Sequence, residues 1–63
     1  MWIVVGMANN QMTAAGMKDA LEAEGVLVKL RQTSASAKNN VIEVLVLESE
    51  TDLAREVLLE KGL

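Results

Sequence analysis

Leu21-Glu22-Ala23-Glu24-Gly25-Val26, which continues directly into Leu27-Val28-Lys29-Leu30, is the stretch that decides the fold of this chain. We expect Gly25 to end a helix, because glycine adopts the left-handed backbone conformation without a steric penalty. The side chains from Val26 onward alternate between two faces, as those of a half-buried strand do. Because the two signals adjoin, the chain must pass from a helix into a strand with almost no linker. This predicts the middle of a β-α-β unit.

The segments before this turn complete that unit. Residues 2–7 form a short apolar, β-branched run that is typical of a buried strand. Residues 11–24 carry apolar side chains at helical spacing, and either Asn9 or Asn10 could cap the first turn of this helix. Gly16 inside the helix is tolerable if the helix backbone lies close to the sheet there.

The segments after the turn add a hairpin and a second helix. Residues 26–31 are a strand, the polar residues 32–40 are expected to form a loop, and residues 41–47 are the strongest strand. Ser49 and Asp52 match the spacing of a capping box at the start of the last helix, and Gly62 ends it. The expected apolar stripe of that helix consists of Leu53, Val57 and either Leu58 or Leu59.

The resulting order, β-α-β-β-α over residues 1–63, predicts one α+β domain. Both helices are expected on one face of a three-stranded sheet, with the first strand parallel to the third and the second on the far side. This is a ferredoxin-like fold that lacks its fourth strand. The first strand, apolar on both faces, is then an open edge that favours pairing with another chain.

The composition narrows the function. The chain has 63 residues, no Cys, no His and a net charge of −3 with both signs interspersed. Nucleic acid is not an expected partner, because nucleic-acid binding needs a clustered basic surface. No apolar run approaches the length of a membrane span, which together with the N-terminal composition predicts a cytoplasmic protein. A domain this small buries little surface, so self-association is the expected source of added stability.

A family resemblance extends over nearly the whole chain. It is carried by Lys18, the segment from Leu21 to Val26, Glu43-Val44-Leu45-Val46 and Asp52-Leu53-Ala54-Arg55-Glu56-Val57-Leu58. Together these resemble the family of prokaryotic signal-transducing proteins, which are short bacterial domains of uncharacterised function. The resemblance implies a fold like that of PII regulatory proteins, which are trimeric ferredoxin-like sensors, with residues 32–40 at their flexible loop. Two features depart from the family pattern: Leu47 replaces a frequent Pro, and residues 6–12 keep little of the usual helix start.

Several residue groups could bind a ligand, but each has a simpler structural explanation. Gly6, Asn9 and Asn10 precede a helix N-terminus, which favours anions, although they contain no phosphate-binding motif and fit an ordinary turn. Lys29, Arg31 and Lys38 are a local basic group that also suits a protected edge strand. Glu48, Glu50 and Asp52 lack the spacing of a calcium loop and suit a helix dipole, so no metal or cofactor is expected. Ser34 and Ser36 have no adjacent base, and no enzyme activity is expected.

Four apolar residues are expected to lie on the sheet face opposite the helices: Leu27, Val41, Leu45 and Leu47. A contiguous apolar patch on neighbouring strands is typical of an interface. We therefore expect a non-catalytic regulatory or interaction module that forms homo-oligomers through this face or through the edge of the first strand. The alternative is a PII-like or ACT-like sensor of a nucleotide or amino acid, with a mobile loop at residues 32–40.

Overall fold

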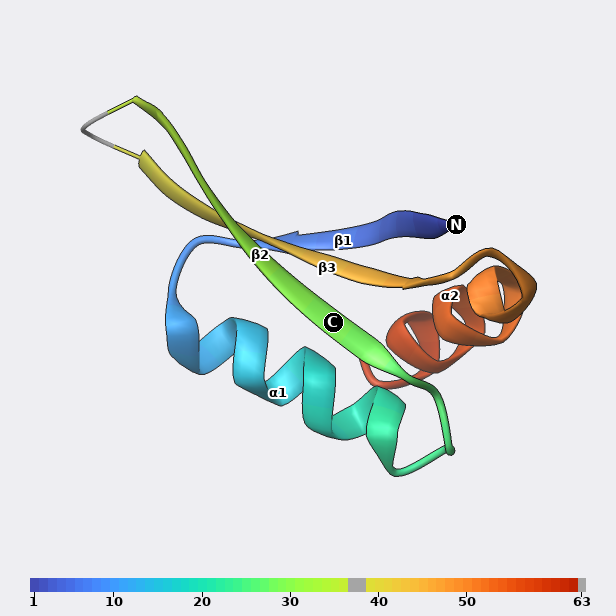
Figure 1. The fold of residues 1–63 in the computed structure, drawn as a ribbon. Helices are drawn as coiled ribbons and strands as arrows, with labels where there is room; N and C mark the ends of the chain where they lie inside the picture. The colour runs from blue at the N-terminus through green and yellow to red at the C-terminus, as the bar shows by residue number, and fades with distance from the viewer. Residues whose placement is uncertain (37–38, 63) are drawn as a thin grey trace.

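The described part of the chain, residues 1–36 and 39–62, forms an α+β domain in the computed structural model. In residues 33–36 and 39–40 only the backbone is described. The elements in order are β1 (Trp2–Ala8), α1 (Gln11–Glu22), β2 (Val28–Ser36), β3 (Asn39–Leu47), a 3-10 turn (Glu48–Glu50) and α2 (Thr51–Glu60). Figure 1 shows the sheet with α1 and α2 beside it, an arrangement that is compatible with a small ferredoxin-like domain.

The sheet has the strand order β1-β3-β2, and β3 is antiparallel to both of its neighbours. The predicted order is confirmed, but the predicted parallel pairing of the first and third strands is wrong. The chain returns through α1, so β1 and β2 run in the same direction. The hairpin then reverses β3, which therefore lies antiparallel to both strands when it inserts between them.

The turn at Gly25 has the hydrogen bonds of a Schellman motif. The Val26 amide donates to the Leu21 carbonyl at 3.1 Å and the Gly25 amide to the Glu22 carbonyl at 2.9 Å. Gly25 has a φ of +80°, as expected for the residue that ends such a helix. Leu21 and Val26 are both buried, so the turn fixes the end of α1 against the start of the following strand segment.

One apolar core lies between the helices and one face of the sheet. Its strand residues on β3 are Ile42, Val44 and Val46, the face predicted from their alternation. The helices contribute Ala14, Met17 and Leu21 from α1 and Ala54, Val57 and Leu58 from α2. The predicted stripe of α2 is confirmed at Val57 and, of the two alternatives, at Leu58, whereas Leu53 is exposed and Ala54 is buried in its place.

A bulge in β1 adapts this strand to the helices. The register against β3 shifts between Val4 and Gly6. A Cβ atom at Gly6 would meet the terminal methyl of Met17, so the missing side chain lets α1 approach the strand. Val5 packs on the core, whereas Val4 pairs with Leu45 of the outer face. The sequence does not predict which face of β1 packs on the helices. The structure shows that it is the face of Val5 and not that of Val4.

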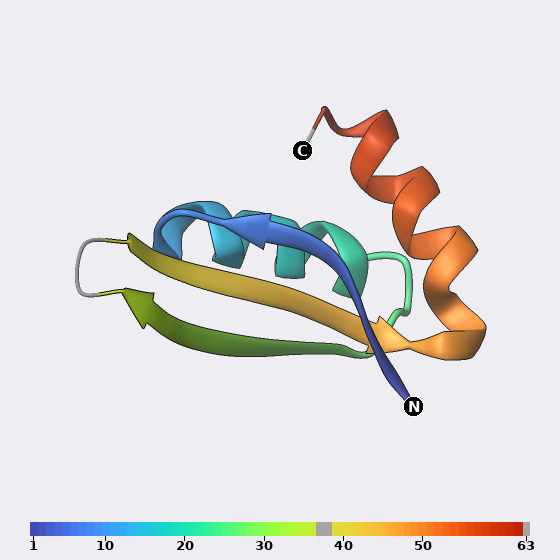
Figure 2. The same ribbon diagram turned by 90° about the horizontal axis from the view of Figure 1, so that it is seen from above.

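The predicted loop at residues 32–40 is wrong for most of its length. β2 continues to Ser36 and β3 begins at Asn39, with Ser36 paired to Asn39, while residues 37–38 lie outside the described residues. Ladder hydrogen bonds join backbone groups, so short polar side chains do not prevent strand formation. The hairpin therefore extends well beyond the end of β1, as Figures 1 and 2 show.

The start of α2 also differs from the predicted capping box. The residue before the helix is Glu50, which makes no side-chain capping hydrogen bond. Instead the Thr51 hydroxyl donates to the Glu48 carbonyl at 2.7 Å, within the 3-10 turn that precedes the helix. At α1 the prediction is confirmed, because Asn10 Oδ1 accepts from the Thr13 amide at 2.8 Å.

The same substitution at two glycines tests the turn that decides the fold. A Cβ at Gly16 meets nothing within 4 Å, so the helix does not need a glycine there for close packing, contrary to expectation. We predict that Gly16→Ala raises the free energy of unfolding by about 1 kcal/mol. Gly25→Ala should lower it by about 1–2 kcal/mol, because alanine is strained at positive φ. Urea titration of both variants measures the change in the free energy of unfolding. No change in Gly25→Ala would contradict the role given to this turn.

Candidate functional site

The outer face of the sheet, opposite the helices, carries an apolar strip across its strands. Trp2 pairs with Leu47, and Val4 pairs with Leu45, which in turn pairs with Lys29 of β2. Residues two apart on a strand share a face, so Leu45 and Leu47 lie together between the two edge strands. Two of the four residues that the sequence predicts as an interface, Leu45 and Leu47, lie in this strip.

The strip is partly covered by its own neighbours. The Lys29 ammonium lies 5.7 Å from the centroid of the Trp2 ring, although the two residues belong to opposite edge strands. A cation at this distance is attracted by the ring face, with about 0.5–1 kcal/mol at exposed sites. Leu45, on the strand between them, is only 3% exposed. Leu45, at the centre of the outer face, is therefore covered by residues of the same chain.

The four predicted interface residues do not form one exposed patch. Leu45 is buried, Val41 and Leu47 are half-buried, and Leu27, which precedes β2, is 65% exposed. Val41, Leu45 and Leu47 all lie on β3 and alternate with its buried helix-facing residues, as predicted, whereas Leu27 lies before the start of β2. Of the four, only Leu27 presents a large exposed apolar surface.

The predicted basic group is divided by the structure. Arg31 forms an ion pair with Glu43 on the neighbouring strand, with 2.6 Å between Nη2 and Oε1, and its Nε donates to the same oxygen. Lys29 lies over Trp2, and Lys38 is outside the described residues. The two described cations therefore have partners inside the chain and protect the β2 edge.

The two edges of the sheet differ in charge. β2 carries Lys29 and Arg31, which discourage the pairing of an additional strand. β1 contains no charged residue and no Pro, although it is an edge strand as well. Its Met7 side chain is 63% exposed. Of the two edges, β1 is the one open to another strand.

An apolar groove lies beside the β1 edge, between α1 and α2. It has a volume of about 340 Å³ and is lined by Val5, Gly6, Met7, Thr13, Met17, Arg55, Leu58 and Leu59. Leu59 is 82% exposed although it follows two buried residues of α2. Met7 and Leu59 escape prediction from sequence because each looks like a regular core position. The sequence feature that points to this site is the absence of charged residues in β1.

The predicted anion site has another use in the structure. Asn10 Oδ1 accepts from a first-turn amide of α1, and Gly6 lies within β1 beneath Met17. Asn9 is exposed in the turn between β1 and α1. The three residues therefore act in capping, packing and turning the chain, which is the ordinary explanation of this segment.

The predicted acidic cluster is not assembled into a metal site. No group of three or more acidic side chains in the described residues is placed to hold a metal ion, Glu48, Glu50 and Asp52 included. The side chains of Ser34 and Ser36 lie outside the described residues. Within residues 1–36 and 39–62, no helix is long and apolar enough to cross a membrane.

The chain was compared with known protein families, curated proteins and solved structures, and no match was found in any of them. The candidate site is therefore defined by geometry alone. It consists of the uncharged β1 edge, with the exposed Met7 and Leu59 and the groove between the helices. The outer apolar strip adjoins the same edge through Trp2 and Val4.

Two leucine substitutions test whether the strip is covered within one chain. Leu45→Ala should lower the free energy of unfolding by about 2–3 kcal/mol, because a buried leucine leaves a cavity when it is truncated. Leu27→Ala should change it by less than about 0.5 kcal/mol, as exposed positions do. Urea titration at low protein concentration provides both values. Equal effects of the two substitutions would mean that Leu45 is not covered by Trp2 and Lys29.

Proposed function

We propose that this chain is a small non-catalytic regulatory or interaction module that associates with a second copy of itself through the free edge of β1. The observation that carries the proposal is the asymmetry of the two sheet edges. β2 is protected by charged residues, whereas β1 is uncharged and lies beside an apolar groove. Natural edge strands without such protection pair with other strands.

The proposed pairing is that of a ferredoxin-like domain without its fourth strand. In that fold the fourth strand lies beside the first, at the edge that β1 leaves open here. A two-fold symmetric contact between β1 strands would join two sheets into one, as isologous interfaces do. It would also cover Met7 and bring apolar surface against Leu59. A small domain gains burial from such a contact.

The bulge in β1 shapes this contact. It divides the edge into two short segments, one on each side of Val5, and bulges are among the features that limit edge pairing. The backbone hydrogen bonds between two β1 edges would therefore extend over only a short stretch. Side chains beside the edge supply the rest of the contact: Leu59 at the groove, and Met7, whose pairing with Glu43 places it on the outer face of the same edge.

The alternative function, a PII-like or ACT-like sensor of a nucleotide or amino acid, is supported less. Its proposed mobile loop at residues 32–40 is mostly strand in the described residues. Membership in the family of prokaryotic signal-transducing proteins, a signalling role and a cytoplasmic location remain proposals that come from the sequence. Self-association through β1 does not depend on any of them.

Met7 and Leu27 offer a matched test, because they are almost equally exposed, at 63% and 65%. We predict that sedimentation equilibrium finds a dimer for the unmodified chain and a monomer for Met7→Lys. Leu27→Lys should remain a dimer, because it lies away from the β1 edge. Circular dichroism of both variants checks that they are folded.

Two outcomes would overturn the proposal. A well-folded monomer of the unmodified chain at millimolar concentration would exclude self-association as its function. Dissociation by Leu27→Lys but not by Met7→Lys would place the contact at the β2 side of the sheet instead of the β1 edge.

A further inference from the structure

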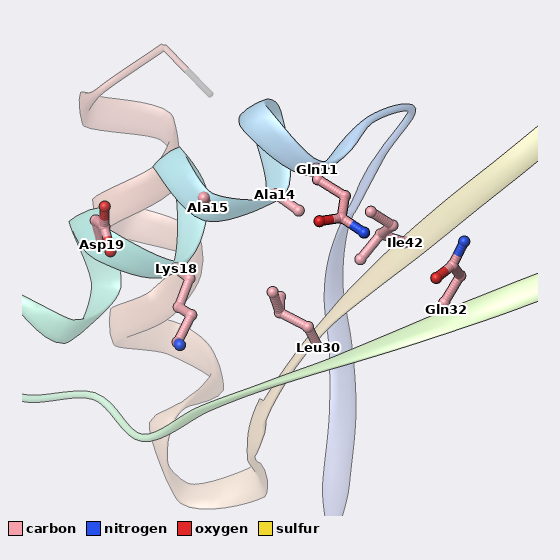
Figure 3. A pocket seen from close by; sticks show the side chains of 8 residues that line it. All are labelled: Gln11, Ala14, Ala15, Lys18, Asp19, Leu30, Gln32 and Ile42. Carbon is pink, nitrogen blue, oxygen red and sulfur yellow. The ribbon is translucent and has the colours of Figure 1, made fainter.

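A second cavity lies between residues 11–19 of α1 and the paired strands β2 and β3 (Figure 3). Its volume is about 330 Å³. It is lined by Gln11, Ala14, Ala15, Lys18, Asp19, Leu30, Gln32 and Ile42. None of these residues lines the groove at the β1 edge, so the α1 cleft, as we call it, is a separate site.

The α1 cleft exists because this part of the helix carries small side chains. Ala15 is exposed at the α1 cleft, where a larger residue would cover part of the sheet, and the neighbouring Ala14 is buried. Leu30 pairs with the fully buried Val44 and so lies on the helix-facing side, yet it is 38% exposed. Leu30 therefore forms an apolar floor that is partly open to a ligand, with the buried Ile42 beside it.

Polar groups stand at both ends of this apolar floor. In Figure 3 the Lys18 ammonium extends toward β2 at one end, and the Gln11 and Gln32 amides lie at the other, with Leu30 and Ile42 between them. The Asp19 carboxylate is turned away from the floor. Within the described residues none of the three side chains, Gln11, Lys18 or Gln32, has a hydrogen-bond or ion-pair partner. Their polar groups are free to bind.

We infer that the α1 cleft binds an aliphatic carboxylate that carries a second hydrogen-bonding group at the far end of its chain. The carboxylate pairs with the Lys18 ammonium, and the methylene chain lies on the exposed part of Leu30. The far group, a hydroxyl or an amide, bonds to the Gln11 and Gln32 amides. Pockets that combine an apolar lining with a few polar groups at fixed positions bind small molecules in this way. This inference does not rest on the pairing of β1.

The test is a titration with ω-hydroxyhexanoate, followed by amide and methyl NMR shifts of the full chain. We expect shifts that saturate at Ala15, Leu30 and Ile42, with no comparable change at Met7 or Leu59. Protonated 6-aminohexan-1-ol has the same six-carbon chain and terminal hydroxyl with the opposite charge, and should give no saturable shift. Equal shifts with both probes would mean that only the apolar floor binds, which would overturn the inference.

Three variants separate the parts of the site. Lys18→Gln should weaken binding about fivefold, the upper range for an exposed ion pair. Lys29→Gln removes the same charge on the outer face and should leave the affinity unchanged. Ala15→Leu, at an exposed helix position, should fill the α1 cleft and abolish binding while the helix content stays the same. Binding that survives Ala15→Leu, or that falls equally in Lys18→Gln and Lys29→Gln, would contradict the assignment, as would no saturable shift in the unmodified chain.

Discussion

The turn from Leu21 to Val26 is the constraint on which the rest of this domain depends. Its two hydrogen bonds end α1, and its two buried apolar residues hold the helix end against the sheet. Because the strand segment follows at once, β2 begins at a fixed place beneath the helix. The hairpin then returns β3 between β2 and β1, and the whole strand order follows from this placement.

That order leaves two edges, and the domain treats them differently. On β2 the charges of Lys29 and Arg31 are bound to Trp2 and Glu43, so the same residues protect the edge and cover the centre of the outer face. On β1 the adaptation is steric: a bulge and the bare Gly6 let the helices approach. This packs the core well, but it adds no charge to the strand. The edge of β1 is open because β1 is the last strand in the sheet order.

The sequence alone predicts the elements whose signals are local. The stop at Gly25, the cap at Asn10 and the buried face of Ile42, Val44 and Val46 each depend on neighbours in the chain, and each is confirmed. Features that depend on distant residues are missed. Leu45 is buried because Trp2 and Lys29 reach it from two other strands. The hairpin extends through polar residues because the hydrogen bonds between its strands join backbone groups and do not require apolar side chains. Gly16 is open because it lies on the exposed side of α1.

The central claim is that the free edge of β1 pairs with a second chain, and amide hydrogen exchange tests it most directly. Exchange is measured by NMR at a low and at a high protein concentration. We predict that the β1 amides not bonded to β3 exchange more slowly at high concentration, while the edge amides of β2 near Lys29 and Arg31 keep the same rate. If the β1 rates do not depend on concentration, or if protection increases at the β2 edge instead, the account is contradicted.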